Sequence, residues 1–276
     1  MKYLKLVNFE INRFFKLYMV LVGMVIVSQI AGVIVESRSF IKEANMTIRE
    51  LGLTYTSYAE DYGSLSLGSI MRSGWFVLPI ALCIAGLSFY VFFIWYRDWF
   101  GKNTFVYRLL MLPTARLNIY FAKATTIFIS VLGLVGLQLL LLPIENKLFR
   151  SLVPVDLRHD APMSELFTFF DGLGIIIPAH LSTFIIHYGI GFMIVFIIFT
   201  AILFERSYRL KGIVFGGLYC VIALGIFLLP FIIVIYQEKM YLYPNEMFWL
   251  EVFLGLIVTA MSFVVSSYLL NRKINV

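Results

Sequence analysis

Six long apolar stretches follow one another along the chain, and they constrain its fold more than any motif does. A helix that crosses a bilayer needs about 20 mostly apolar residues. Hydrophobic residues make up 61% of the 276 residues and only 14% are charged, whereas soluble domains carry about 25% charged residues. A water-soluble core could not bury that much apolar surface, but a bilayer solvates the outward faces of membrane helices. The predicted spans are residues 17–35, 75–96, 124–142, 181–204, 212–236 and 249–270.

The fold class that follows is all-α, a polytopic membrane helical bundle of about six transmembrane helices. We expect residues 1–276 to form a single transmembrane domain, because the apolar stretches are spread from one end of the chain to the other. Aromatic residues that favour the headgroup layer lie at the ends of several stretches. They are Trp75, Tyr96, Tyr236 and Trp249.

The charge of the connections predicts an orientation. Connections that carry an excess of Lys and Arg stay in the cytoplasm. One set, residues 1–16, 97–123, 205–211 and 271–276, holds 14 basic and three acidic residues. The other set, residues 36–74, 143–180 and 237–248, holds eight basic and 12 acidic residues. We therefore expect both termini in the cytoplasm of a multi-pass protein of the cell (plasma) membrane. The basic excess lies in strips that flank the membrane, so it gives no support for nucleic-acid binding.

Two outer connections, residues 36–74 and 143–180, are too long to be simple turns, and we expect both to hold short helices at the outer surface. In the second, Asp160 can cap a helix that has Pro162 in its first turn. Ser164 is an alternative cap for a shorter helix.

Motifs for catalysis are missing from the sequence. It has no G-x-x-x-x-G-K-[ST], no H-E-x-x-H, no G-x-S-x-G and no paired Cys-x-x-Cys, so the loops that cradle nucleotide phosphates or hold a catalytic zinc are not expected. We therefore expect no enzyme activity, no metal site and no cofactor in this chain.

Two ionisable residues within the apolar stretches form a candidate intramembrane polar site. Such groups are often functional. His187 lies in the fourth span and has no acidic neighbour in sequence, so a structural hydrogen bond between helices is the alternative. Glu251 follows Trp249 by two residues, which places it near the outer interface.

The inner connection 97–123 has the most informative pattern. Asn103 or Thr104 can cap a short helix, and Pro113 cannot continue it. Phe105, Leu109 and Leu112 would then lie on one side, with Arg108 at its edge. The pattern fits a docking site for a partner protein, and it fits an interfacial helix resting on lipid equally well.

The run Tyr107-Arg108-Leu109-Leu110-Met111-Leu112-Pro113-Thr114-Ala115-Arg116, continuing to Lys123, resembles the segment after the second span in permease subunits of ABC-2-type transporters. Residues 9–16 resemble the N-terminal amphipathic segment of that family, which implies an interfacial helix over residues 1–16. The resemblance also implies that residues 103–113 form a coupling helix that docks into an ATP-binding cassette subunit. Phe105, Leu109 and Leu112 would pack there, and Arg108 and Arg116 would pair with acidic groups of that subunit.

The function that the resemblance implies is that of a bacterial permease subunit, an exporter of a peptide, an antibiotic or a lipid-like amphipathic compound. ATP would be hydrolysed on the separate subunit, and a second permease copy or a related permease would complete a dimer. The alternatives from other classes are a non-transporting membrane sensor or scaffold, and an ion-coupled carrier.

Overall fold

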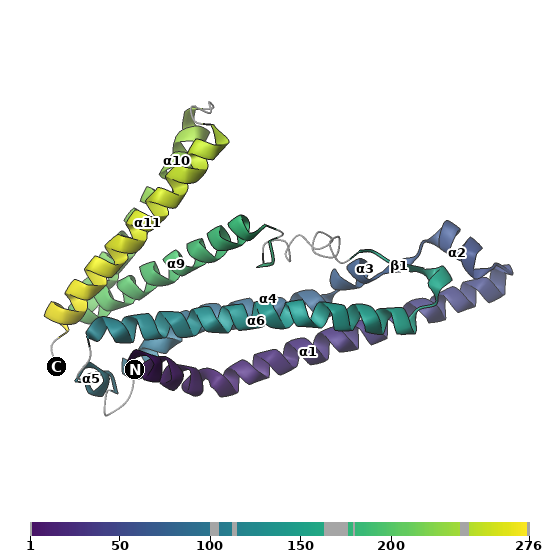
Figure 1. The fold of residues 1–276 in the computed structure, drawn as a ribbon, viewed down its shortest axis with the longest axis horizontal. Coiled ribbons are helices and arrows are strands. Elements are labelled where there is room, and N and C mark those ends of the chain that lie inside the picture. The colour runs from purple at the N-terminus through teal and green to yellow at the C-terminus, as the bar shows by residue number, and fades with distance from the viewer. Residues whose placement is uncertain are drawn as a thin grey trace. The chain divides into compact units, whose positions relative to one another are not determined.

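A computed structural model describes residues 2–99, 105–111, 115–162, 176–178, 180–237 and 243–274. Within these ranges six helices are long and apolar enough to cross a membrane. This confirms the all-α, polytopic helical bundle (Figure 1). The six helices are α1 (Lys2–Leu51), α4 (Gly74–Trp99), α6 (Arg116–Leu152), α9 (Leu181–Tyr208), α10 (Leu210–Gln237) and α11 (Pro244–Tyr268).

Shorter elements join these helices. They are α2 (Tyr55–Tyr62), β1 (Leu65–Ser66), α3 (Leu67–Met71), α5 (Phe105–Leu110), the 3-10 turn η1 (Val155–Leu157), β2 (Arg158–His159) and the π-helical turn η2 (Leu269–Lys273). The two strands pair in parallel, Leu65 opposite Arg158.

The chain divides into two compact units, and the single transmembrane domain over residues 1–276 stays a prediction. Four helices, α1, α4, α6 and α9, run without a break from one unit into the other. Unit 1 is Met1–Arg13, Leu87–Phe128 and Ile185–Val276, and unit 2 is Phe14–Gly86 and Ile129–Phe184.

The first helix is longer than either of the two elements predicted for its region. The interfacial helix 1–16 and the span 17–35 are parts of one helix, α1, that continues to Leu51. Its 50 residues correspond to about 75 Å at the usual rise of 1.5 Å per residue. Because the apolar core of a bilayer is about 30 Å thick, a large part of α1 must lie outside it.

The connections after the first and third spans are accordingly shorter than predicted. Residues 36–51 extend α1, and residues 143–152 extend α6. Charged side chains end the apolar stretches, but they do not end a helix. The first helix ends where Gly52 adopts a positive φ of 66°, a conformation that glycine adopts readily. α6 tolerates Pro143 within it and ends at Leu152, two residues before Pro154.

These extensions form a small core in unit 2 together with α2, α3 and η1, and we call residues 36–74 and 143–162 the distal subdomain. The predicted short helices are present in residues 36–74, as α2 and α3. The helix predicted to begin directly after Asp160 does not start there, since Ala161 and Pro162 are not helical. The rest of that segment, including the alternative start at Ser164, lies outside the described residues. The buried core consists of Val33, Ala44, Tyr58, Leu67, Ile70, Met71, Phe76, Leu142, Phe149, Val153, Leu157 and Ala161.

Helices α1 and α4 pack closely in unit 2. A side chain on Gly32 would place a Cβ atom 2.5 Å from the Cβ of Trp75, so this contact requires a glycine. The hydroxyl of Ser28 donates a hydrogen bond to the carbonyl of Trp75 at 2.8 Å. Small residues allow such close helix contacts inside membranes.

Candidate functional site at the junction of the predicted inner connections

The four connections predicted to be cytoplasmic meet at one end of unit 1. Leu6 and Val7 of α1 share a buried cluster with Leu109 of α5 and with Ile119 and Ala122 of α6. Residues of the fourth and last connections also reach this end, as the contacts of Glu205, Arg206 and Arg116 described below show. This agrees with their predicted placement on the same side of the membrane.

Glu205, at the end of α9, accepts a hydrogen bond from the hydroxyl of Tyr96 in α4. The guanidinium carbon of Arg206 lies 4.6 Å from the ring centre of Tyr96 and 5.6 Å from that of Trp99. A guanidinium over an aromatic face is a favourable contact. The end of α9 is thereby held against the end of α4.

An ion-pair network is buried at this end of unit 1. The ammonium of Lys123 in α6 lies 2.7 Å from a carboxylate oxygen of Glu10 in α1, and it also pairs with Asp98 in α4. Lys123, Glu10 and Asp98 are only 1%, 2% and 0% exposed. Two partly exposed arginines extend the network, since Arg97 pairs with Glu10 and Arg13 pairs with Asp98, both at 2.7 Å.

The lysine uses its full hydrogen-bonding capacity. An ammonium group has three donors, and those of Lys123 reach Glu10, Asp98 and, at 2.9 Å, the carbonyl of Ile94. A buried charge is costly unless it is paired and hydrogen-bonded. The ends of α1, α4 and α6 are therefore held together by groups that none of these helices could bury alone.

Sequence reasoning missed this network. Glu10, Asp98 and Lys123 entered the prediction only as charges in the inner connections. The partners are 25 to 113 residues apart in the chain, so no local pattern joins them. The available signal was their position, because each lies within seven residues of an apolar stretch.

A short helix, α5 (Phe105–Leu110), is present in the segment where the sequence pattern predicts one, and its role as a coupling helix stays a prediction. We expected Leu109 on a docking face for another subunit, but its side chain is 5% exposed and packs inside this chain. Arg108, one residue earlier, is exposed. The side chain of Phe105 and all of Leu112 and Pro113 lie outside the described residues.

Arg116 also has a role within the chain. Its guanidinium donates hydrogen bonds to the carbonyls of Leu270 and Ile274, the latter at 2.9 Å. Carbonyls at the end of a helix lack partners within the helix, and Arg116 supplies donors for two of them. These contacts lie within the chain, and the expected pairing of Arg116 with an acidic group of another subunit stays a prediction.

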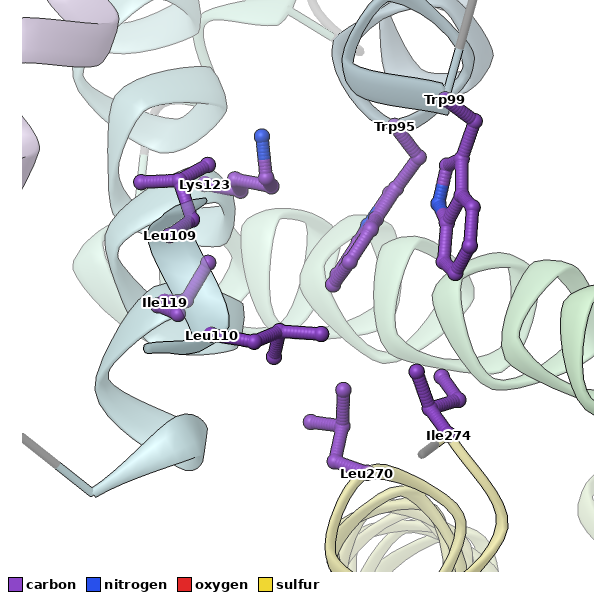
Figure 2. A pocket seen from close by; sticks show the side chains of 8 residues that line it. All are labelled: Trp95, Trp99, Leu109, Leu110, Ile119, Lys123, Leu270 and Ile274. Carbon is purple, nitrogen blue, oxygen red and sulfur yellow. The ribbon is translucent and has the colours of Figure 1, made fainter. Parts of the chain in front are cut away.

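A small cavity of about 10 Å³ lies between α5 and the surrounding helices (Figure 2). A cavity of this size has room for about one water molecule. The side chains around it come from α4, α5, α6 and the C-terminal turn (Figure 2). A shift of α5 would therefore change contacts with the other three segments together. The lining residues are Trp95, Trp99, Leu109, Leu110, Ile119, Lys123, Leu270 and Ile274.

The two residues of the candidate intramembrane polar site lie on different helices. His187 is exposed on α9, and Glu251 is partly buried on α11. No hydrogen bond or ion pair between them is present in the described parts of these helices. One carboxylate oxygen of Glu251 is buried without a hydrogen-bond partner among the described residues.

Comparisons of the chain with family models, with curated proteins and with solved structures give no match.

Proposed function

We propose that this chain is the membrane-spanning permease subunit of an ATP-driven exporter of the ABC-2 type, located in a bacterial plasma membrane. A separate ATP-binding cassette subunit docks on α5 and hydrolyses the ATP, and a second permease copy or a related permease completes a dimer. The cargo class is a peptide, an antibiotic or a lipid-like amphipathic compound. The observation that supports this proposal is the position of α5, with an exposed Arg108 beside a Leu109 that is buried against α1 and α6.

In this proposal α5 transmits motion of the ATPase subunit to the membrane helices. Force applied at Arg108 passes through Leu109 to the clustered side chains of α1 and α6. The network of Lys123, Glu10 and Asp98 makes the ends of α1, α4 and α6 move as one body. Packed elements of this kind shift between discrete arrangements and do not deform smoothly. Motion of the ATPase would thus reach three spans at once.

The experiment that tests the proposal is co-purification from native membranes. The tagged chain should bring down a subunit that carries a P-loop ATPase sequence, identified by mass spectrometry. Arg108→Glu should reduce its recovery, because the exposed charge that faces the partner is reversed. Lys147→Glu is the matched control, since it reverses an exposed cation on α6 in the distal subdomain. Equal recovery with both variants, or no ATPase in any preparation, would contradict the proposal.

One observation favours a second candidate function, that of a non-transporting sensor. The distal subdomain supplies most of one buried core, which also includes Val33, Phe76 and Leu142 of the predicted spans, and a folded part beyond the apolar stretches suits ligand recognition. A sensor would retain ligand binding to this subdomain and show no ATP-dependent transport in liposomes that contain the ATPase subunit. An ion-coupled carrier would instead transport in response to an ion gradient without nucleotide.

A further inference from the structure

A groove between α1 and α4 in unit 2 is unrelated to the coupling site. Its volume is about 420 Å³, which lies within the range of about 300–1,000 Å³ that is usual for small-molecule sites. Apolar side chains line most of it, and one carboxylate lies among them. The residues that carry the argument are Met24, Glu36, Trp75, Leu78, Pro79 and Leu82.

The groove has an apolar end and a charged end. Helices α1 and α4 run antiparallel, since Leu21 approaches Gly86 while Gly32 approaches Trp75. Met24 and Leu82 therefore lie toward one end, and Glu36 and Trp75 toward the other. From Met24 to Glu36, α1 rises about 18 Å, which is slightly more than half the thickness of a bilayer core of about 30 Å.

The position of Glu36 matches a membrane interface. It is the first residue after the apolar stretch 17–35, and Trp75 begins the stretch 75–96. Trp favours the headgroup layer. The apolar part of the groove would then face one leaflet, and the carboxylate would lie at headgroup level.

The charge of the groove selects its occupant. No hydrogen bond or ion pair of the Glu36 carboxylate is present in the described residues, and no lysine or arginine lines the groove. The ring of Trp75, which is 41% exposed, lines the same end. An ammonium group gains from an ion pair with a carboxylate and from the face of a tryptophan ring.

We propose that this groove binds a cationic amphiphile, a molecule with an ammonium head and one flexible alkyl chain. The head pairs with Glu36 beside Trp75, and the chain extends along Leu78 and Leu82 toward Met24. The proposal of a binding site depends only on the shape and charge of the groove. Export of the bound molecule would rest on the proposed permease function.

The test uses the full chain in nanodiscs of an uncharged glycolipid, which has no ammonium head of its own, without any ATP-binding subunit. The probe is tetradecyltrimethylammonium with a photoreactive diazirine near the end of its alkyl chain, and its adducts are mapped by mass spectrometry. We expect adducts at Met24 and Leu82. Unlabelled tetradecyltrimethylammonium should compete, and tetradecyl sulfate of the same chain length should not.

Two variants separate charge from shape. Glu36→Gln should weaken binding by about tenfold, the size expected for one lost charged contact, whereas Glu50→Gln, which removes an exposed charge on the same helix, should leave it unchanged. Leu82→Trp should block labelling by filling the groove. Its control is Leu228→Trp on the exposed face of α10. If Glu36→Gln is not monodisperse on gel filtration, it is not correctly folded. The comparison of Leu82→Trp with Leu228→Trp then tests the proposal.

Three results would overturn the proposal. They are unchanged binding in Glu36→Gln, equal competition by the sulfate, and adducts spread evenly over the lipid-facing helices. The last would mean that the probe only partitions into the bilayer. The binding test contains no ATPase, so its outcome does not depend on the permease function. If the groove binds the probe but a separate assay with the ATPase subunit shows no ATP-dependent transport, the permease function is contradicted and the groove site still stands.

Discussion

Lys123 shows how much of the junction depends on one side chain. Its ammonium faces two carboxylates and one carbonyl, and almost none of it reaches solvent. Breaking a buried ion pair by removing one partner is more harmful than replacing the whole pair, because the remaining charge stays buried.

Lys123→Met should therefore be strongly destabilising. We expect a loss of about 3–5 kcal/mol in the free energy of unfolding, seen as a lower thermal midpoint of the purified protein in detergent. Lys147→Met, on the exposed face of the same helix, is the control and should change little. Adding Glu10→Gln and Asp98→Asn to Lys123→Met should recover part of the loss. No recovery would argue against a direct electrostatic role.

Gly32 is the second residue at which a single atom matters. Gly32→Ala should lower the thermal midpoint, since the new Cβ would lie 2.5 Å from the Cβ of Trp75, and overpacking of this kind costs about 1–3 kcal/mol. Gly23→Ala makes the same change on the same helix at a position with no atom within 4 Å. It should be neutral or slightly stabilising. Equal midpoints for the two variants would show that the helices separate without cost.

At the scale of single residues, the sequence predicted some features of the candidate site and missed others. The position of Arg108 on a short helix followed from the pattern around Pro113, because local apolar spacing and a helix breaker are both readable in one segment. The burial of Leu109 and the use of Arg116 did not, since their contacts come from α1 and from the C-terminal turn. Local sequence cannot show which distant segment covers a side chain.

At the scale of helices, apolar stretches predicted which segments cross the membrane but not where the helices end. The predicted ends at residues 35 and 142 mark the last apolar residues, and α1 and α6 continue for 16 and 10 residues more. Hydropathy reports the solvent around a helix, whereas the helix itself ends at a Gly or near a Pro. The sequence prediction therefore missed the distal subdomain, which is built partly from helix residues beyond the apolar stretches.

These extensions should be accessible from water. In a Cys220→Ser background, Ser39→Cys and Lys147→Cys should react with a membrane-impermeant maleimide, because both positions are exposed and lie beyond the apolar stretches. Val20→Cys is also exposed on the helix surface, at 70%, but it lies within the apolar stretch and should not react. Labelling of Val20→Cys equal to that of Ser39→Cys would place the membrane elsewhere on α1.

At the scale of the whole molecule, the structure shows which connections lie at the same end, and the charge count predicts on which side of the membrane that end lies. Contacts between the N-terminal part of α1, α5, the end of α9 and the C-terminal turn group four connections at one end of unit 1. The excess of Lys and Arg gives that end its cytoplasmic assignment, which stays a prediction.

Labelling of intact cells checks this assignment. Lys5→Cys and Arg272→Cys, both exposed, should react with an impermeant maleimide only after the cells are permeabilised. Lys147→Cys should react in intact cells. We expect this pattern because cytoplasmic connections carry the basic excess, and the reverse pattern would invert the orientation and move α5 away from any cytoplasmic ATPase.

The network at the junction also has a consequence for synthesis of the protein. Its two carboxylates, Glu10 and Asp98, leave the ribosome before Lys123, so until α6 arrives neither has the ammonium that it contacts in the finished protein. We expect the ends of α1 and α4 to reach their stable arrangement only when α6 is inserted. The helices from residue 181 onward would then join an end whose charges are already neutralised, and a chain that stops before Lys123 should be recognised and degraded by quality-control proteases.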